Sequence, residues 1–167
     1  MTVLAKLYIK QKVFSWKDKF SVFNELGEDV YRVEGEILSI GKKLHVNDLN
    51  DREVAFIHEK VFSLLPRYFI SRNGSDIAEV RKKLTFLKAR YEIPDFGWTV
   101  QGNFTAHEFT VESPTGTVAA ISKKWFTWGD TYEINVAHGA DPVNVLCVVL
   151  IIDAVLARQA QAAASST

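Results

Sequence analysis

The chain of 167 residues has a single cysteine, Cys147, and no net charge, with 20 basic and 20 acidic side chains. One cysteine excludes an internal disulfide framework and fits a reducing, cytoplasmic setting. The charge balance excludes the basic footprint of a non-specific nucleic-acid binder, and we expect no sequence-specific nucleic-acid partner. The N-terminus, MTVLAKLYIKQK, lacks the long apolar run and the cleavage site of a signal peptide.

Metal-binding and catalytic signatures are also scarce. No two of the four histidines lie at a spacing typical of a metal site. These are His45, His58, His107 and His138. Residues 47–51 are rich in side-chain oxygens, but an Asx-rich hairpin loop accounts for them, since the glycine and distal glutamate of an EF-hand are missing. Cys147 lies in the most apolar stretch, where burial raises a thiol pKa and makes it unreactive. We therefore predict no enzyme activity, no metal and no cofactor.

A short motif recurs six times. A polar pair is followed by apolar positions and, in most copies, a hydroxyl residue. The second polar residues of the six copies are Lys12, Glu36, Lys60, Lys83, Asn103 and Lys124. In five units, an apolar residue eight positions further on opens a β-rich run: Phe20, Leu44, Tyr68, Tyr91 and Tyr132. The fifth unit departs from the pattern, because its run begins early, at residue 108.

Each unit continues through turn-prone residues into a second apolar run, so it predicts two strands joined by a tight turn. Asn73-Gly74, for example, suits the positive φ angles of a type I′ turn. Six units predict about twelve strands, and closure into a barrel removes the exposed edges of such a meander. Side chains alone do not fill a twelve-strand barrel, so another segment must occupy its centre.

The apolar residues 143–157 (VNVLCVVLIIDAVLA) suit that role. Asp141 is the expected N-cap and Pro142 the first helical residue. Residues 145–152 have no polar face, which indicates burial on all sides. We predict one domain, residues 1–158, with a central helix at about 142–158 and a disordered tail at 159–167. A membrane or interfacial segment and a strand are the alternatives, although the apolar run is short for a span.

Asp153 is the one polar residue of that buried stretch. A buried carboxylate needs a partner, and hydrogen bonds from strand backbone or from a Lys or Arg at the barrel mouth are the expected ones. The alternative is a proton or ligand site inside the barrel.

Three basic clusters are the candidate ligand site. They are Lys42-Lys43, Arg81-Lys82-Lys83 and Lys123-Lys124. These side chains suit lipid phosphate, with Trp16, Trp125 and Trp128 as interfacial anchors. Alternatively, the clusters are solvated strand ends that guard against aggregation. Adjacent lysines in a strand point to opposite faces, so each pair presents at most one charge to a given surface.

Several segments resemble the LURP-one-related family, over roughly residues 4–156. They are KQKVFSWKDKFSV, GEDVYRVEGEILSIGKKL, VAFIHEKVFSLLPRYFI, ISKKWFTWGDTYEINVA and VVLIIDAVLA. That family belongs with the Tubby C-terminal-like superfamily, which includes the phospholipid scramblases. The resemblance implies a bacterial member with a mainly β fold, a twelve-stranded antiparallel β-barrel enclosing a central hydrophobic C-terminal α-helix. It also implies an association with phosphoinositides or other membrane lipids, without assigning a lipid site to particular residues.

These observations predict a non-enzymatic binding module, cytoplasmic or peripheral to a membrane, whose partner is an anionic phospholipid headgroup, a membrane surface or a protein. The alternative is a structural or regulatory protein-interaction domain without a small-molecule ligand. A filled barrel argues against an enzyme, because it lacks a cavity in which acid–base groups are shielded from water.

Overall fold

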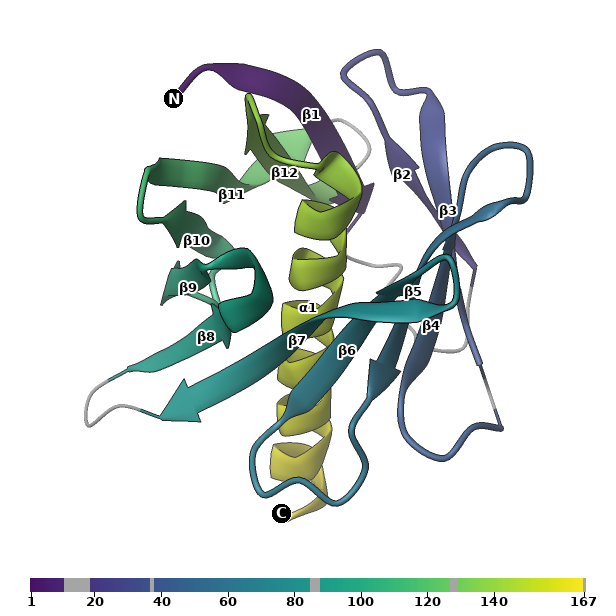
Figure 1. Ribbon diagram of the computed structural model, residues 1–167, viewed down its shortest axis with the longest axis vertical. Helices are drawn as coiled ribbons and strands as arrows, with labels where there is room; N and C mark the ends of the chain where they lie inside the picture. The colour runs from purple at the N-terminus through teal and green to yellow at the C-terminus, as the bar shows by residue number, and fades with distance from the viewer. Residues whose placement is uncertain (11–18, 37, 85–87, 127–128, 167) are drawn as a thin grey trace.

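The structure is a computed structural model, and it describes residues 1–10, 19–36, 38–84, 88–126 and 129–166 (Figure 1). The elements, in chain order, are β1 (Val3–Lys10), β2 (Phe20–Phe23), β3 (Asp29–Gly35), β4 (Lys43–Asn47), β5 (Glu53–Glu59), β6 (Arg67–Arg72), β7 (Ser75–Leu84), β8 (Ala89–Ile93), the 3-10 turn η2 (Pro94–Phe96), β9 (Trp98–Asn103), β10 (Glu108–Ser113), β11 (Gly116–Phe126), β12 (Gly129–Ala137) and α1 (Pro142–Ser165).

The twelve strands form one closed antiparallel barrel in the order β1-β12-β11-β10-β9-β8-β7-β6-β5-β4-β3-β2. The predicted fold class is therefore confirmed. The origin of the twelfth strand differs from the repeat-based prediction, because the sixth unit supplies only β12 and then continues into α1. Strand β1 precedes the first unit and closes the barrel, pairing Leu7 with Ile134 on one side and Tyr8 with Phe23 on the other.

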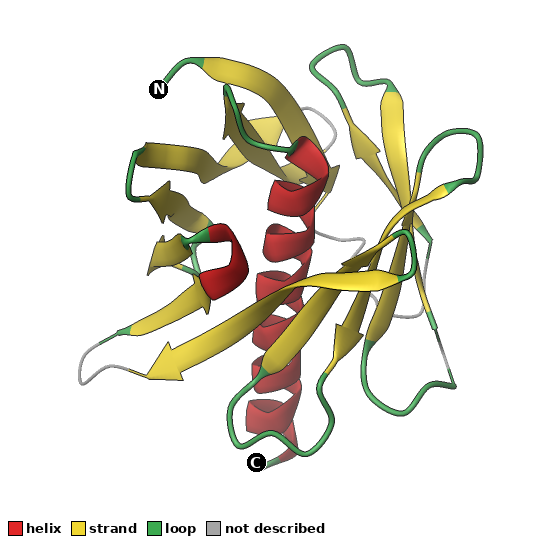
Figure 2. Cartoon of the chain, in the orientation of Figure 1, coloured by secondary structure: helices red, strands yellow, loops and turns green. Residues whose placement is uncertain are grey.

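Alternation along the strands builds the inner wall. In β4, Leu44 and Val46 are buried, and in β8 so are Tyr91 and Ile93, while their neighbours are more exposed. Period-two burial is what a strand with one face on the core requires. Buried apolar side chains of the strands form one core cluster with those of α1, which runs through the barrel (Figure 2).

Helix α1 begins as predicted. The Asp141 carboxylate accepts hydrogen bonds from the backbone N–H groups of Val143 at 2.8 Å and Asn144 at 3.3 Å. Every residue from 145 to 152 is 0% exposed, which confirms burial on all sides. By length and composition α1 could also cross a bilayer, but here its apolar side chains pack against the strands.

The end of α1 differs from the prediction. The helix continues to Ser165, so residues 159–165, for which we expected disorder, are an exposed extension of it. The reason is the alanine-rich sequence, since alanine has the highest helix propensity and needs no packing partner.

The barrel has two distinct ends. At the upper end α1 begins, and this end carries the turns 24–28, 48–52 and 73–74. At the lower end α1 leaves the barrel, beside residues 38–42 and 60–66 (Figure 1). The connection 104–107 lies at the same end, since Phe104 lines a pocket with Leu156 of α1. Asn73 and Gly74 have φ angles of 51° and 76°, as the predicted type I′ turn requires.

One arginine ties the start of α1 to the upper end. Arg72, the last residue of β6, forms an ion pair with Asp141 at 2.5 Å and donates from Nε to the carbonyl oxygen of Val54 at 3.0 Å. Burial opposes ionisation of Asp141, but the bonds from Arg72 and from the helix backbone outweigh it, so the pKa of Asp141 is lowered.

Candidate functional site at the lower end of the barrel

The three predicted basic clusters all lie at the lower end. Lys42 and Lys43 stand at the start of β4, whereas the other two clusters close β7 and β11. In an antiparallel barrel the starts of even-numbered strands and the ends of odd-numbered strands share one rim. The clusters, spread over the sequence, therefore share the rim formed by the start of β4 and the ends of β7 and β11.

Outward-facing members of the clusters are paired with carboxylates. Lys43 lies 3.3 Å from Glu36, Arg81 lies 2.5 Å from Glu79, and Lys124 lies 3.7 Å from Glu133. Exposed ion pairs of this kind contribute between about 0 and 1 kcal/mol to stability. For these side chains the interpretation as solvated strand ends describes the structure well.

The inward-facing members differ, because they line the mouth around α1. Lys82 continues the buried series of Ala78 and Val80 on β7 and is only 7% exposed. Lys123 stands opposite the buried Tyr132 in the register of β11 and β12. Lys42 lines a cavity of about 410 Å³ together with Arg158 of α1. Each cluster thus sends one lysine inward, as strand alternation predicts.

A carboxylate and an arginine complete this mouth. Glu59, at the end of β5, accepts a hydrogen bond from the backbone N–H of Lys42 at 3.0 Å and pairs with Arg158. Lys42, Lys82, Lys123 and Arg158 thus lie at the mouth around α1, where the carboxylates of Glu36 and Glu59 also line the cavity beside Lys42.

Inside the barrel, next to the mouth, a ring of large side chains packs around α1. It is formed by residues that come eight positions after the motif, Phe20, Leu44, Tyr68, Tyr91 and Tyr132. All are at most 7% exposed. Burial raises the pKa of both Tyr68 and Tyr91, so these phenols stay neutral. Where its residues are described, the motif therefore places polar residues on the rim of the barrel, and in five of the units the residue eight positions later belongs to the apolar ring around α1.

Large apolar side chains are exposed at both ends of the barrel, and apart from Leu26 of the upper end the most exposed of them lie at the lower end. They are Leu38 (97% exposed), Ile40 (82%), Phe62 (101%), Leu64 (104%) and Leu84 (66%). Phe62 has a φ of 66°, which a bulky residue adopts only at a cost of about 1–3 kcal/mol. These five residues are called the apolar tips. Several apolar side chains on neighbouring loops indicate an interaction surface.

Asp153 is buried one turn before α1 leaves the barrel, and its partner is a histidine. The Nε2 atom of His107 lies 3.2 Å from the Asp153 Oδ1 atom, and the His107 ring stacks on Tyr132 with centroids 4.2 Å apart. Neither carboxylate oxygen has an aligned hydrogen-bond donor among the described residues. Burial raises the pKa of Asp153, and the contact with His107 offsets part of that rise.

This pairing differs from the predicted strand backbone or Lys/Arg partner. The connection 104–107 turns into the barrel, burying Phe104 and giving His107 a φ of 54°. The early run of the fifth unit was the sequence signal for this inward turn.

Other predicted features have structural roles. His45 faces outward between Glu53, at 2.6 Å, and Glu36, at 3.0 Å. Burial raises the pKa of Cys147 to about 12, as expected for an unreactive thiol. Asp48 accepts backbone bonds from Asn50 and Arg52, which makes residues 47–51 an Asx-type turn.

Of the expected interfacial anchors, Trp16 and Trp128 lie outside the described residues, and so does the side chain of Trp125.

Comparison with known proteins places the chain in a family. The model of the family described as LURP-one-related matches residues 5–153. The chain belongs to the LURP-one-related family. It is 34% identical over 153 residues to the protein called "Uncharacterized protein YxjI" of Bacillus subtilis (strain 168), covering 92% of this chain and 94% of that one.

A solved structure supports the fold of this LURP-one-related chain. An X-ray structure of a protein from Arabidopsis thaliana superimposes with a TM-score of 0.69 and 17% sequence identity, over 90% of both chains. At that identity the likeness establishes the fold alone. The family and the helix-filled barrel fit a non-enzymatic domain.

Proposed function

We propose that the lower end of the barrel binds anionic membrane surfaces. The observation that carries this proposal is that the apolar tips lie on the same rim as the inward lysines and Arg158. Stable attachment of a folded domain to a membrane usually needs two signals, an apolar one and a basic one. Both signals occur here on one end of one barrel.

The expected energies are modest but additive. Each CH₂ group moved from water into the acyl region contributes about 0.8 kcal/mol. Each lysine near an anionic surface contributes about 1 kcal/mol. Phe62 and Leu64, which are fully exposed, have the largest gain available, since no folded contact is lost when they insert.

Vesicle flotation tests the proposal. The protein should float with vesicles of phosphatidylcholine and phosphatidylglycerol and stay behind with phosphatidylcholine alone. The double variant Phe62→Ser/Leu64→Ser should bind at least roughly tenfold more weakly. The double variant Lys123→Gln/Lys124→Gln should bind roughly tenfold more weakly at low salt, and less so at high salt.

Leu26 supplies the matched control. It is 80% exposed at the upper end, so Leu26→Ser removes a largely exposed leucine from the other end of the barrel and should leave flotation unchanged. Failure of the wild type to bind anionic vesicles at low salt would refute the proposal. In that case the protein-interaction domain, which uses the same tips for a protein surface, takes its place.

A further inference from the structure

An open pocket of about 520 Å³ lies beside the point where α1 leaves the barrel. Its wall comes from β7, β8, the connection 104–107 and α1. The lining includes Lys82, Lys88, Tyr91, Phe104, Leu156 and Gln159. This volume falls in the range of sites for small ligands.

Lys82 is the unusual residue of this pocket. It is 7% exposed, and none of the described carboxylates lies within ion-pair distance of its Nζ atom. Burial lowers its pKa, with no opposing effect of an acidic neighbour. A lysine that merely covers apolar surface keeps its ammonium in bulk water. Lys82 is almost entirely enclosed and lines the open pocket, where an anion would compensate its charge.

The floor of the pocket is apolar and firmly built. Tyr91 and Phe104 meet edge to face with ring centroids 5.0 Å apart, and Phe104 also contacts Phe109 at 5.3 Å. Leu156 extends this surface along α1. The ammonium of Lys82 beside an aromatic and aliphatic floor suits a ligand that has a charged head and an aliphatic chain. A bare inorganic anion would leave the floor in contact with water.

Gly102 shows that the wall depends on a close approach of two strands. Its φ is 143°, and a Cβ atom there would lie 2.6 Å from both the carbonyl oxygen of Glu108 and the Cα atom of Phe109. Only glycine permits this approach. The tight β9–β10 pairing in turn directs Phe104 into the pocket, so the floor is part of the folded framework.

We infer that this pocket binds one anionic amphiphile, a phosphate monoester or carboxylate attached to an aliphatic chain, with its head at Lys82 and its chain over Tyr91, Phe104 and Leu156. The inference rests on the proposed function for its source of ligand, because a bilayer at the lower end would supply such molecules. The pocket itself requires only the monomeric amphiphile.

Calorimetric titration with monomeric decyl phosphate, below the concentration at which it forms micelles, tests the inference. One molecule should bind per chain. Lys82→Met, which keeps the length of the side chain and removes the charge, should weaken binding at least roughly tenfold. Lys83→Met, the matched control on the outward face of the same strand, should change it less than roughly twofold. Lys82→Arg, which keeps the charge, should retain binding.

Three ligand comparisons identify the class. Decanoate should bind, whereas decanol and inorganic phosphate should bind at least roughly tenfold more weakly than decyl phosphate. Equal binding of decanol would overturn the role of Lys82, and equal binding of inorganic phosphate would overturn the role of the floor. Equal losses in Lys82→Met and Lys83→Met would also overturn the site.

Two further measurements separate this site from folding and from membrane attachment. Thermal unfolding of Lys82→Met should occur at or above the wild-type temperature, because burial lowers the pKa of Lys82 and so disfavours its charged form in the folded protein. A lower unfolding temperature would instead assign Lys82 a structural role and refute the inference. Flotation of Lys82→Met with anionic vesicles should stay within roughly fivefold of wild type. Amphiphile binding without flotation would refute membrane attachment and leave the pocket standing.

Discussion

The two ends of the barrel are built differently although the same repeat supplies both. Side chains of the upper end satisfy its backbone: Asn24 accepts bonds from the N–H groups of Leu26 and Glu28, and Asp48 does the same in the next turn. At the lower end, apolar tips and lysines project from longer connections. The lower end has such bonds as well, from the N–H of Lys42 to Glu59 and from the N–H of Ala106 to Asn103, so the ends differ mainly in how exposed their apolar side chains are.

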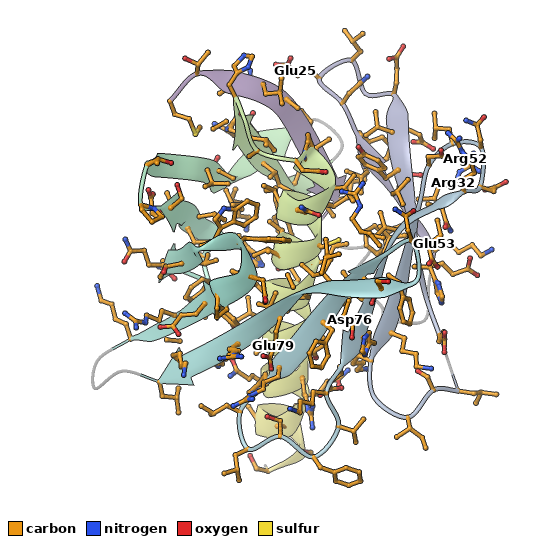
Figure 3. All side chains as sticks on the ribbon, viewed as in Figure 1. Glu25, Arg32, Arg52, Glu53, Asp76 and Glu79 are labelled. Carbon is orange, nitrogen blue, oxygen red and sulfur yellow. The ribbon has the colours of Figure 1, made fainter. Side chains whose placement is uncertain are left out.

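Two carboxylates, at the start of α1 and near its exit from the barrel, differ in their surroundings. Asp141 at the upper end is ionised, caps α1 and pairs with Arg72. Asp153 at the lower end is buried, and among the described residues His107 is the one ionisable side chain paired with it. The folded protein lowers the pKa of Asp141 and raises that of Asp153, each from an ordinary value of 3.8. Figure 3 shows how densely side chains fill the space between these ends.

Truncation gives the largest expected effect. A chain that ends at Asp141 should fail to fold, because α1 contributes twelve buried residues. At about 1.5–3 kcal/mol for each large apolar side chain, their loss exceeds the 5–15 kcal/mol of a typical domain. A chain that ends at Arg158 should keep its unfolding free energy within about 0.5 kcal/mol. Circular dichroism and urea unfolding measure both, and a cooperatively folded Asp141 truncation would contradict the central role of α1.

Loss of the ion pair between Asp141 and Arg72 at the start of α1 should have the next largest effect on stability. Asp141→Ala should lower the unfolding free energy by about 2–3 kcal/mol, because it deletes an N-cap and leaves Arg72 without its partner. Arg158→Ala at the lower end is the control: Arg158 is 59% exposed, so its loss should cost less than about 1 kcal/mol. Equal losses of unfolding free energy in the two variants, measured by urea unfolding, would contradict the expected difference between the two ends.

The pH dependence of Asp153 should be smaller and opposite in sign to that of Asp141. Because its folded pKa is raised, Asp153 favours the folded state fully only below about the unfolded value of 3.8, and this contribution is lost as pH rises through the folded pKa. Asp153→Asn should therefore be more stable than wild type by about 1–2 kcal/mol at pH 8, with the advantage vanishing near pH 3.8.

Asp141 provides the comparison for that measurement. Its lowered pKa stabilises the folded state above about pH 3.8 and loses that effect on acidification. The stability deficit of Asp141→Ala should therefore shrink as pH falls, while the advantage of Asp153→Asn also shrinks. Urea unfolding from pH 3 to pH 8 measures both slopes, and a pH-independent difference for Asp153→Asn would refute a raised pKa.

Sequence patterns anticipated most of the fold because those patterns are local. Strand alternation, the Asn73-Gly74 turn and the Asp141-Pro142 helix start each depend on a few neighbouring residues. The repeat also located the ring residues such as Tyr68 and Tyr91. The repeat did not predict β1, because this strand lies before the first copy of the motif. Its place in the barrel is defined by its pairing with β12 and β2.

The candidate site was only partly predictable. Strand alternation already implied that each basic cluster sends one lysine to each face. The gathering of Lys42, Lys82 and Lys123 around one mouth depends on which strand ends share a rim, which only closure of the barrel decides. The pairing of His107 with Asp153 joins residues of β9–β10 and α1, and it requires the positive φ of His107.

By itself, the sequence determined the secondary structure, the closed barrel and the burial of α1, because period-two strands and an all-apolar helix have few ways to satisfy both backbone and core. The tertiary structure alone decided which charges lose their solvent. Lys82 and Lys83 are chemically identical neighbours, yet one lies in the mouth of the barrel and the other outside it. That difference arises from which face of β7 meets α1, and it is the basis of the proposed binding site.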